Sequence, residues 1–215
     1  MPLIAEIQTG FGRAGIWELS EKPIELSEFL LLSEAENLEF EKIKSAKRQT
    51  EYLATRLLLE KLLGKKTEIG YQSDGRPFLK ETHLNISISH SANLLIIMLS
   101  EQVCGADTEV KSRNIDQVAK RFLHPKEIGF IESSGNRQFL LMLHWCAKEA
   151  IFKCSRQHGI QFDEQIIIQP FNFETELFFN GILLSDGKTE YYRLQWMELK
   201  NNIIVFCVEI ENIEK

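Results

Sequence analysis

Two long stretches with helical spacing, one in each half of the chain, most restrict what this sequence can fold into. Ser45–Leu63 repeats apolar residues at helical intervals and is followed by Gly64, a typical helix-ending residue. Asn136–Arg156 carries a second apolar stripe of the same kind. Strand-like segments surround both. The pattern predicts an α+β fold of two pseudo-symmetric α/β halves, each a long helix packed on a small, mainly antiparallel sheet.

The segments around these helices define the expected organisation. Strands are predicted at Leu3–Ile7, Ile16–Leu19, Leu84–Ser91, Leu94–Leu99 and Val103–Val110, and throughout the β-rich segment Gln165–Ile210, with turns at Asn180-Gly181 and Asp186-Gly187. Further helical segments are predicted at Glu25–Phe40, broken near Ser33, and at Ile115–Phe122 and Pro125–Ile131. The halves join near Ser100–Gly105, so we expect two domains, 1–102 and 103–215, with no sequence repeat between them.

Composition excludes several classes of function. The chain of 215 residues is 44% hydrophobic and 26% charged, which is ordinary for a globular protein. No apolar run approaches the ~20 residues of a membrane span, and the N-terminus lacks a basic region followed by an apolar stretch. A net charge of −6 argues against a nucleic-acid partner. The four cysteines lie far apart, so we expect buried reduced thiols and a cytoplasmic location.

Asp107 and Glu109 are the first residues that indicate chemistry. Side chains alternate along a strand, so both carboxylates point to one face while Ala106 and Thr108 point to the other. Two carboxylates at such positions repel each other unless a cation lies between them, and oxygen ligands suit Mg²⁺. For an isolated Asp-x-Glu, a solvated strand edge is the competing explanation.

Three further residues extend this set. Glu149 and Lys153 lie one helical turn apart, on a different face from the apolar stripe, so Glu149 could complete an oxygen site and Lys153 could reach a phosphate. A surface Glu–Lys pair, worth only ~0.2–0.5 kcal/mol, is the alternative. His90 could be a core histidine or a ligand, and its flanking serines favour a phosphate or hydroxyl site over a metal site.

The first long helix carries basic residues at positions that we expect to be exposed. These residues are Lys47, Arg48, Arg56 and Lys61. A solvated basic face explains them as well as a ligand site does. After the helix comes the stretch Tyr71–Phe78, in which Asp-Gly and a proline indicate a rigid turn.

At this level of detail the chain resembles the 4′-phosphopantetheinyl transferases of the Sfp type. The matching segments, in the family's order, are Gly75-Arg76-Pro77, Ile88-Ser89-His90-Ser91, Gly105-Ala106-Asp107-Thr108-Glu109, Arg121-Phe122-Leu123-His124-Pro125-Lys126-Glu127 and Trp145-Cys146-Ala147-Lys148-Glu149-Ala150-Ile151-Phe152-Lys153. The chain departs from the family at Ala106 and Thr108, where bulkier aliphatic residues are usual. That departure concerns packing more than chemistry.

The resemblance implies transfer of the phosphopantetheine arm of coenzyme A to a serine of an apo acyl or peptidyl carrier protein, with release of adenosine 3′,5′-bisphosphate. It implies a Mg²⁺ ion held by Asp107, Glu109 and Glu149, with Lys153 on the pyrophosphate. Glu149, directly or through a water, would take the serine proton. The residues implied at the nucleotide end and its 3′-phosphate are Ser73, Gly75, Arg76, Pro77, Ser89 and His90, with Lys47 or Arg48.

Other consequences stay open at this level. Two halves that form one site make a monomer sufficient. The carrier would dock on an apolar patch with basic residues drawn from Lys111, Arg113, Lys120 and Arg121. The sequence does not decide between fatty-acid, polyketide and peptide carriers. The alternatives are another Mg²⁺-dependent phosphotransferase, or a coenzyme A-binding protein of the same fold without transferase activity.

Overall fold

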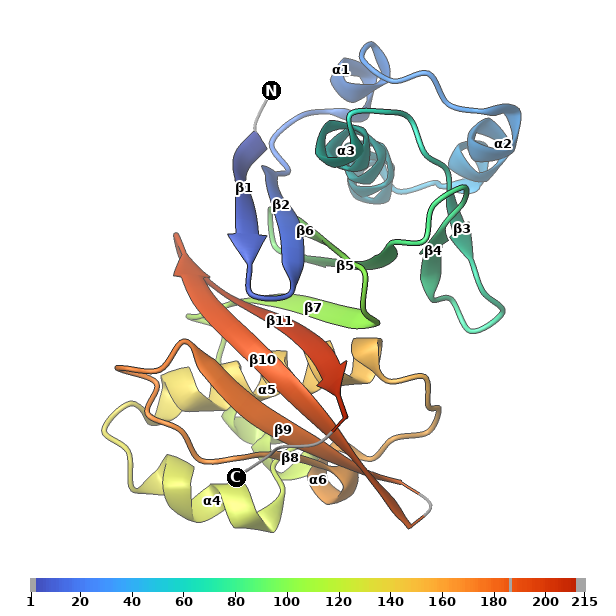
Figure 1. Ribbon diagram of the computed structural model, residues 1–215. Helices are drawn as coiled ribbons and strands as arrows, with labels where there is room; N and C mark the ends of the chain where they lie inside the picture. The colour runs from blue at the N-terminus through green and yellow to red at the C-terminus, as the bar shows by residue number, and fades with distance from the viewer. Residues whose placement is uncertain (1–2, 186, 212–215) are drawn as a thin grey trace.

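A computed structural model describes residues 3–185 and 187–211 of the chain. Two compact groups of elements lie one above the other, the blue-to-green N-terminal group over the yellow-to-red C-terminal group (Figure 1). The elements in chain order are β1 (Leu3–Thr9), β2 (Gly12–Glu18), α1 (Pro23–Ser27), α2 (Glu34–Lys42), α3 (Ala46–Leu63), β3 (Ile69–Tyr71), β4 (Pro77–Leu79), β5 (Asn85–Ser91), β6 (Leu94–Ser100), β7 (Cys104–Val110), the 3₁₀ helix η1 (Asp116–Arg121), α4 (Pro125–Glu132), α5 (Arg137–Cys154), α6 (Phe162–Gln165), β8 (Ile166–Ile168), β9 (Phe178–Ser185), β10 (Lys188–Leu199) and β11 (Asn202–Ile210).

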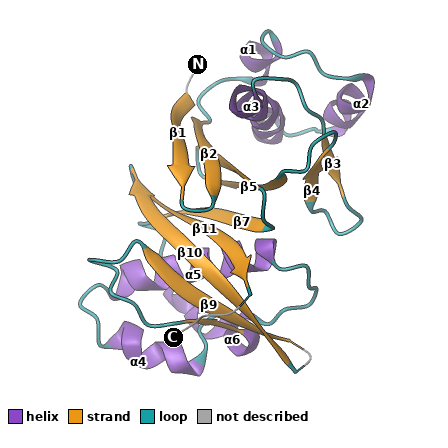
Figure 2. Cartoon of the chain, viewed as in Figure 1, coloured by secondary structure: helices purple, strands orange, loops and turns teal. Residues whose placement is uncertain are grey.

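The N-terminal half is an antiparallel sheet in the order β1-β2-β6-β5, with α3 packed on one face. The hydroxyl of Ser45 accepts a hydrogen bond from the backbone of Arg48, and Gly64 ends the helix in the left-handed conformation at φ 68°. Both signals are local, which is why the predicted helix and the observed helix agree. The short hairpin of β3 and β4 stands beside the sheet (Figure 2).

The C-terminal half is an antiparallel sheet in the order β7-β11-β10-β9-β8, with α5 packed on one face. Helix α5 approaches β7 closely at Gly105, where a Cβ atom would lie 1.9 Å from the carbonyl oxygen of Ala150. Any larger residue at position 105 would push the helix away from the strand. This glycine therefore sets the distance between the two elements that carry the predicted site.

The two sheets pack against each other through the faces that the long helices leave free. Alternate residues of β2 and β6, such as Ile16 and Ile96, meet alternate residues of β7 and β11, such as Ala106 and Phe206, in one buried apolar layer. The order through the molecule is thus helix, sheet, sheet, helix. The fold class is the predicted one, a mixed α+β structure with antiparallel sheets. The chain passes between the sheets after Ser100 and before Cys104, and the division into two domains there stays a prediction.

Most predicted elements are present, and Ser33 caps α2 where a break was expected. The turn predicted at Asn180-Gly181 is wrong. Both residues lie inside β9 and pair with β10, because Gly181 provides room for the side chain of Ile151 on α5. Asp186 of the second predicted turn lies outside the described residues, although Ser185 and Lys188 pair across it.

Arg56 is not an exposed residue of α3, as the sequence suggested. Its side chain is buried, its Nε donates a hydrogen bond of 2.9 Å to Glu36, and its guanidinium lies 3.3 Å from the centroid of the Tyr52 ring. The segment before α3 folds back over the helix and supplies the carboxylate. Arg56 is therefore a structural residue of the N-terminal half and not a surface cation.

The four cysteines are buried and free, as expected. Across residues 3–185 and 187–211, no helix has both the length and the apolar character needed to span a membrane.

Candidate active site

Strand β7 presents Asp107 and Glu109 toward α5. Both follow Gly105 at intervals of two residues, and the intervening Ala106 is packed in the layer between the sheets. The prediction that the two carboxylates share a face is therefore confirmed. Thr108 on the opposite face is buried, and its hydroxyl has no hydrogen-bond partner within the described residues. A threonine at this position therefore leaves one buried polar atom without a hydrogen bond among the described residues, whereas an aliphatic side chain would leave none.

Three serines at alternate positions of β5 hold the neighbouring strand in place. Ser87 Oγ accepts a hydrogen bond of 2.8 Å from the backbone N–H of Ala106. Ser89 Oγ donates to Asp107 Oδ1 at 2.8 Å, and Ser91 Oγ donates to Glu109 Oε2 at 2.9 Å. Because side chains alternate with a period of two in both strands, each of the two carboxylates meets one serine hydroxyl. Ser89 thus contacts a carboxylate in this structure.

Lys153 of α5 completes the surroundings of Asp107. Its Nζ lies 2.7 Å from Asp107 Oδ1, 2.9 Å from Ser89 Oγ and 3.3 Å from the carbonyl oxygen of Ala106. Asp107 Oδ2 is buried and has no hydrogen-bond partner in the described part of the chain. Burial raises the pKa of Asp107, and the nearby charge of Glu109 adds to this, while Lys153 and Ser89 oppose it.

Glu109 and Glu149 differ in how they are held. Glu109 Oε1 accepts hydrogen bonds of 3.1 Å from the indole N–H of Trp145 and from Arg113. Glu149 is half-buried on α5. Burial, together with the charge of Asp107, raises the pKa of Glu149 to about 7. A carboxyl with such a pKa can bind or release a proton near neutral pH.

These acids line one cavity of about 490 Å³ between the two halves of the molecule. Its lining comes from both halves and consists of Tyr71, Gly75, Pro77, Ile88, Ser89, His90, Asp107, Thr108, Glu109, Glu149 and Lys153. The fold therefore gathers most of the residues that the sequence singled out, although they lie up to eighty positions apart in the chain.

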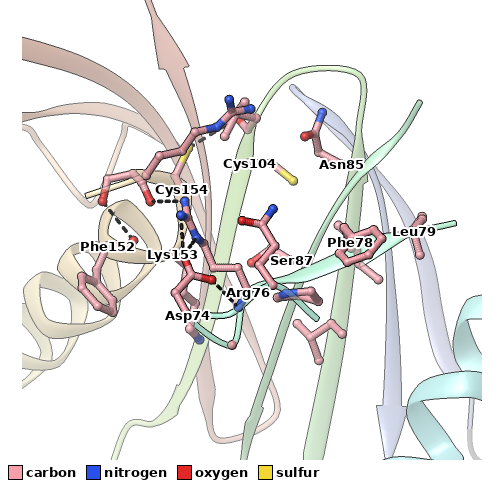
Figure 3. Close-up of a pocket in the computed structure, with 18 of the residues that line it drawn as sticks. Asp74, Arg76, Phe78, Leu79, Asn85, Ser87, Cys104, Phe152, Lys153 and Cys154 are labelled. Atoms are coloured by element: carbon pink, nitrogen blue, oxygen red, sulfur yellow. Dashed lines mark hydrogen bonds and ion pairs between the residues drawn. The ribbon is translucent and has the colours of Figure 1, made fainter. Parts of the chain in front are cut away.

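A second cavity, of about 630 Å³, adjoins the first and shares Gly75, Pro77, Ile88 and Lys153 with it. Figure 3 shows Asp74 and Arg76 beside Lys153, with Phe78 and Leu79 on the other side. Arg76 pairs with Asp74 at 2.5 Å and also approaches the carbonyl oxygen of Ser155 at 3.5 Å. The side chain of Arg76 is thus engaged in this second cavity.

Three of the residues assigned to the nucleotide end lie outside both cavities: Ser73, Lys47 and Arg48. Lys47 is nonetheless close to His90, because Glu51 lies 3.8 Å from Lys47 Nζ and 3.6 Å from His90 Nδ1. Sequence reasoning did not single out Glu51 or Ser87, and it used Ser91 only as a flanking residue of His90 that favours a phosphate or hydroxyl site. The alternating serines of residues 87–91 were a usable signal, whereas nothing local in the sequence indicates the contact between Glu51 and His90.

The donor chemistry of the site suits a hard cation such as Mg²⁺, since three carboxylates line one cavity and a buried Asp107 oxygen lacks a partner. As the side chains lie, however, no three His, Cys, Asp or Glu residues among those described form a group that could hold a metal ion. Lys153 is paired with Asp107, and Arg113 and Trp145 hold Glu109. A shared cation would require these side chains to rearrange.

Comparison with known proteins supports one family. Residues 103–201 match the model of the 4′-phosphopantetheinyl transferase superfamily. The matched segment, just under half of the chain, includes Asp107, Glu109, Glu149 and Lys153. No curated protein matches the chain. The mixed α+β fold with antiparallel sheets is consistent with that superfamily.

Proposed function

We propose that this protein transfers the 4′-phosphopantetheine group of coenzyme A to a serine hydroxyl of an apo carrier protein, in the manner of the Sfp-type enzymes that it resembles. One observation carries the proposal: Asp107, Glu109, Glu149 and Lys153 line a single cavity between the two halves, within a segment that matches the transferase superfamily. The product released with the modified carrier is adenosine 3′,5′-bisphosphate.

The proposed roles follow from charge and position. The pyrophosphate of coenzyme A lies beside Lys153, whose ammonium moves from Asp107 to a phosphate oxygen. Asp107, Glu109 and Glu149 would hold a Mg²⁺ ion, which when bound offsets the negative charge on the pyrophosphate oxygens. Lys153 meets only Oδ1 of Asp107, so Oδ2 has no partner in the described residues, and the charge of Asp107 adds to the raised pKa of Glu149. Both observations support a cation-binding role.

In the transfer step the serine oxygen attacks the β-phosphorus, and the bond from that phosphorus to the bridging oxygen breaks. The electron pair leaves with adenosine 3′,5′-bisphosphate, and the serine proton must be accepted nearby. Glu149 is placed to accept it, directly or through a water, because its carboxylate lines the cavity beside Lys153 and Asp107. Positioning by Lys153 and the carboxylates supplies most of the rate enhancement.

The second cavity is proposed to take the nucleotide end of coenzyme A, because Gly75, Arg76 and Pro77, which the resemblance assigns to that end, line it. Its volume of about 630 Å³ lies in the range of small-molecule sites, and it meets the first cavity at Lys153. Apolar residues such as Phe78 and Ile86 alternate there with polar ones such as Asn85 and Ser87. A nucleoside, with its aromatic base and its hydroxyl-bearing sugar, has the same mixed character.

The carrier partner is proposed on chemical grounds. An acidic carrier helix would dock on basic residues of the C-terminal half, drawn from Lys111, Arg113, Lys120 and Arg121. Lys111 forms an ion pair with Glu198, and Arg113 forms one with Glu109. Lys120 and Arg121 have no ion pair within the described residues, so they are the better candidates for contact with an acidic helix.

The test is mass spectrometry of a panel of apo carrier proteins after incubation with coenzyme A and Mg²⁺. We expect one carrier to gain a single phosphopantetheine group, and Asp107→Asn to slow the gain about 10³-fold. Asp107→Asn keeps the shape of the side chain and removes only its charge. Coenzyme A binding with no modification of any carrier would instead identify a binding protein. Cleavage of coenzyme A without transfer to a carrier would indicate another phosphotransferase or a hydrolase.

A further inference from the structure

Glu51 of α3 lies beside two basic residues, His90 and Lys47, that the resemblance assigns to the 3′-phosphate of coenzyme A. Its Oε1 is 3.6 Å from Nδ1 of His90 and 3.8 Å from Nζ of Lys47. The Glu51 side chain is only 12% exposed, whereas those of His90 and Lys47 are 51% and 67% exposed. An acid that is largely shielded from water thus faces two exposed basic groups.

The contact between Glu51 and His90 joins two different elements, a helix and a strand. Lys47 and Glu51 are four residues apart on α3, and such pairs are common on helix surfaces. His90, in contrast, belongs to β5 and lines the cavity that holds the carboxylates. The fold therefore brings the Glu51 carboxylate to the edge of the proposed nucleotide site.

Two other basic residues expected at this position are less closely linked to His90. Arg76 is paired with Asp74 in the second cavity. Arg48 shares no ion-pair partner with a cavity residue among those described, whereas Lys47 shares Glu51 with His90. The basic groups left near a 3′-phosphate are thus those of His90 and Lys47, and the Glu51 carboxylate already faces both. A phosphate dianion would have to displace the Glu51 carboxylate from both groups and would also be repelled by it.

We infer that Glu51 is a specificity-determining residue that lowers the preference of the site for a nucleotide with a 3′-phosphate. In consequence 3′-dephospho-coenzyme A binds almost as well as coenzyme A, because it has no charge that competes with Glu51. Because the Glu51 side chain is largely buried, water and salt screen its charge poorly. Its charge therefore weakens phosphate binding more than a surface acid would. This inference rests on the proposed function, since it concerns the same ligand.

The experiment is a calorimetric titration of the full chain with coenzyme A and with 3′-dephospho-coenzyme A, at one fixed Mg²⁺ concentration. The variants are Glu51→Gln, which removes the charge in the same shape, and Glu51→Lys, which reverses it. Glu60→Gln is the matched control, because it removes one negative charge from the same helix away from His90. Thermal melting confirms that each variant is folded.

We expect wild type to favour coenzyme A by less than about threefold. Glu51→Gln should raise that preference to about tenfold or more, Glu51→Lys should raise it further, and Glu60→Gln should leave it unchanged. A strong preference in wild type that Glu51→Gln does not increase overturns the inference, as does an equal change in Glu60→Gln. If neither ligand binds any of these proteins, the proposed function itself is wrong, and the inference with it.

Discussion

Helix α5 carries two lysine–carboxylate pairs of nearly equal length and opposite character. Lys148 Nζ lies 2.8 Å from Glu127, and both side chains are fully buried. Lys153 Nζ lies 2.7 Å from Asp107, but the lysine is 28% exposed at the edge of a cavity. Distance alone does not separate a structural pair from a functional one. What separates them is whether each polar atom has all its partners.

The Lys148 pair is complete. Its ammonium also donates to the carbonyl oxygens of Phe122, Phe162 and Ile166, at 2.6 to 3.0 Å. Glu127 in turn accepts hydrogen bonds from the backbone N–H groups of His124 and Ile168. Burial lowers the pKa of Lys148 and raises that of Glu127, but this set of partners favours the charged pair. The pair joins η1, α4 and β8 to the helix.

The Lys153 pair is incomplete. Asp107 Oδ2 is buried without a partner in the described residues, and the lysine reaches its carboxylate from the cavity side. A lysine that is partly exposed can leave its partner at moderate cost, whereas a fully buried one cannot. The first pair therefore stabilises the fold, and the second is available to a ligand.

The largest effect on stability is expected at the buried pair. Lys148→Met leaves the Glu127 carboxylate and three carbonyl oxygens without a partner, so the free energy of unfolding should fall by about 3–5 kcal/mol. Urea unfolding monitored by circular dichroism measures it, with the exposed Lys120→Met as control. A loss below about 1 kcal/mol in Lys148→Met would show that the pair is not a structural centre.

His144, one turn before Lys148, should make the buried side of α5 sensitive to acid. Burial lowers the pKa of His144 from 6.5 to about 4. The unfolded chain then binds a proton that the folded protein excludes, so stability falls as the pH drops from about 6.5 to about 4, by about 3 kcal/mol in total.

His144→Leu should remove this part of the pH dependence, whatever its effect on absolute stability. The measurement is urea unfolding at several pH values between 4 and 7, with the exposed His83→Gln as control. If His144→Leu has the same slope of stability against pH as wild type, the histidine is not buried as the structure describes.

At the incomplete pair the expected effect is on turnover. Lys153→Met removes the ammonium that we place on the pyrophosphate, so the transfer rate should fall by about 10²-fold. The free energy of unfolding should fall less than in Lys148→Met, because Lys153 is 28% exposed and Ser89 still donates a hydrogen bond to the buried Asp107. Transfer assays and urea unfolding of the same preparation measure both. Normal transfer would make Lys153 an ordinary surface partner of Asp107.

The smallest effect is expected at Ser89, which touches both members of the Lys153 pair. Ser89→Ala removes one hydrogen bond from Asp107 and one contact from Lys153, so transfer should fall by roughly tenfold. Ser100→Ala is the control on the neighbouring strand β6, because its hydroxyl contacts backbone groups of Phe11 and Gln102 and it lines neither cavity. Equal losses of transfer in the two variants, measured in the same assay, would mean that Ser89 acts only through the packing of the sheet.

The sequence determined the features that depend on neighbours along the chain. Ser45 and Gly64 mark the ends of α3 because helix caps act within a few residues. Asp107 and Glu109 share a face because side chains alternate along any strand. The four site residues Asp107, Glu109, Glu149 and Lys153 could be selected for the same reason, from strand and helix periodicity and from their place in recognisable motifs.

Only the tertiary structure decided which of these residues meet. The registers of β5 and β7 bring Ser89 to Asp107, and the fold places Glu51 beside His90. It also buries Lys148, and it buries Arg56, which the sequence placed on an exposed helix face. Burial and pairing of charges depend on segments far apart in the chain, and their energies arise only when water is excluded between those segments. No local pattern records that exclusion, so the difference between a structural lysine and a functional one appears only in the folded protein.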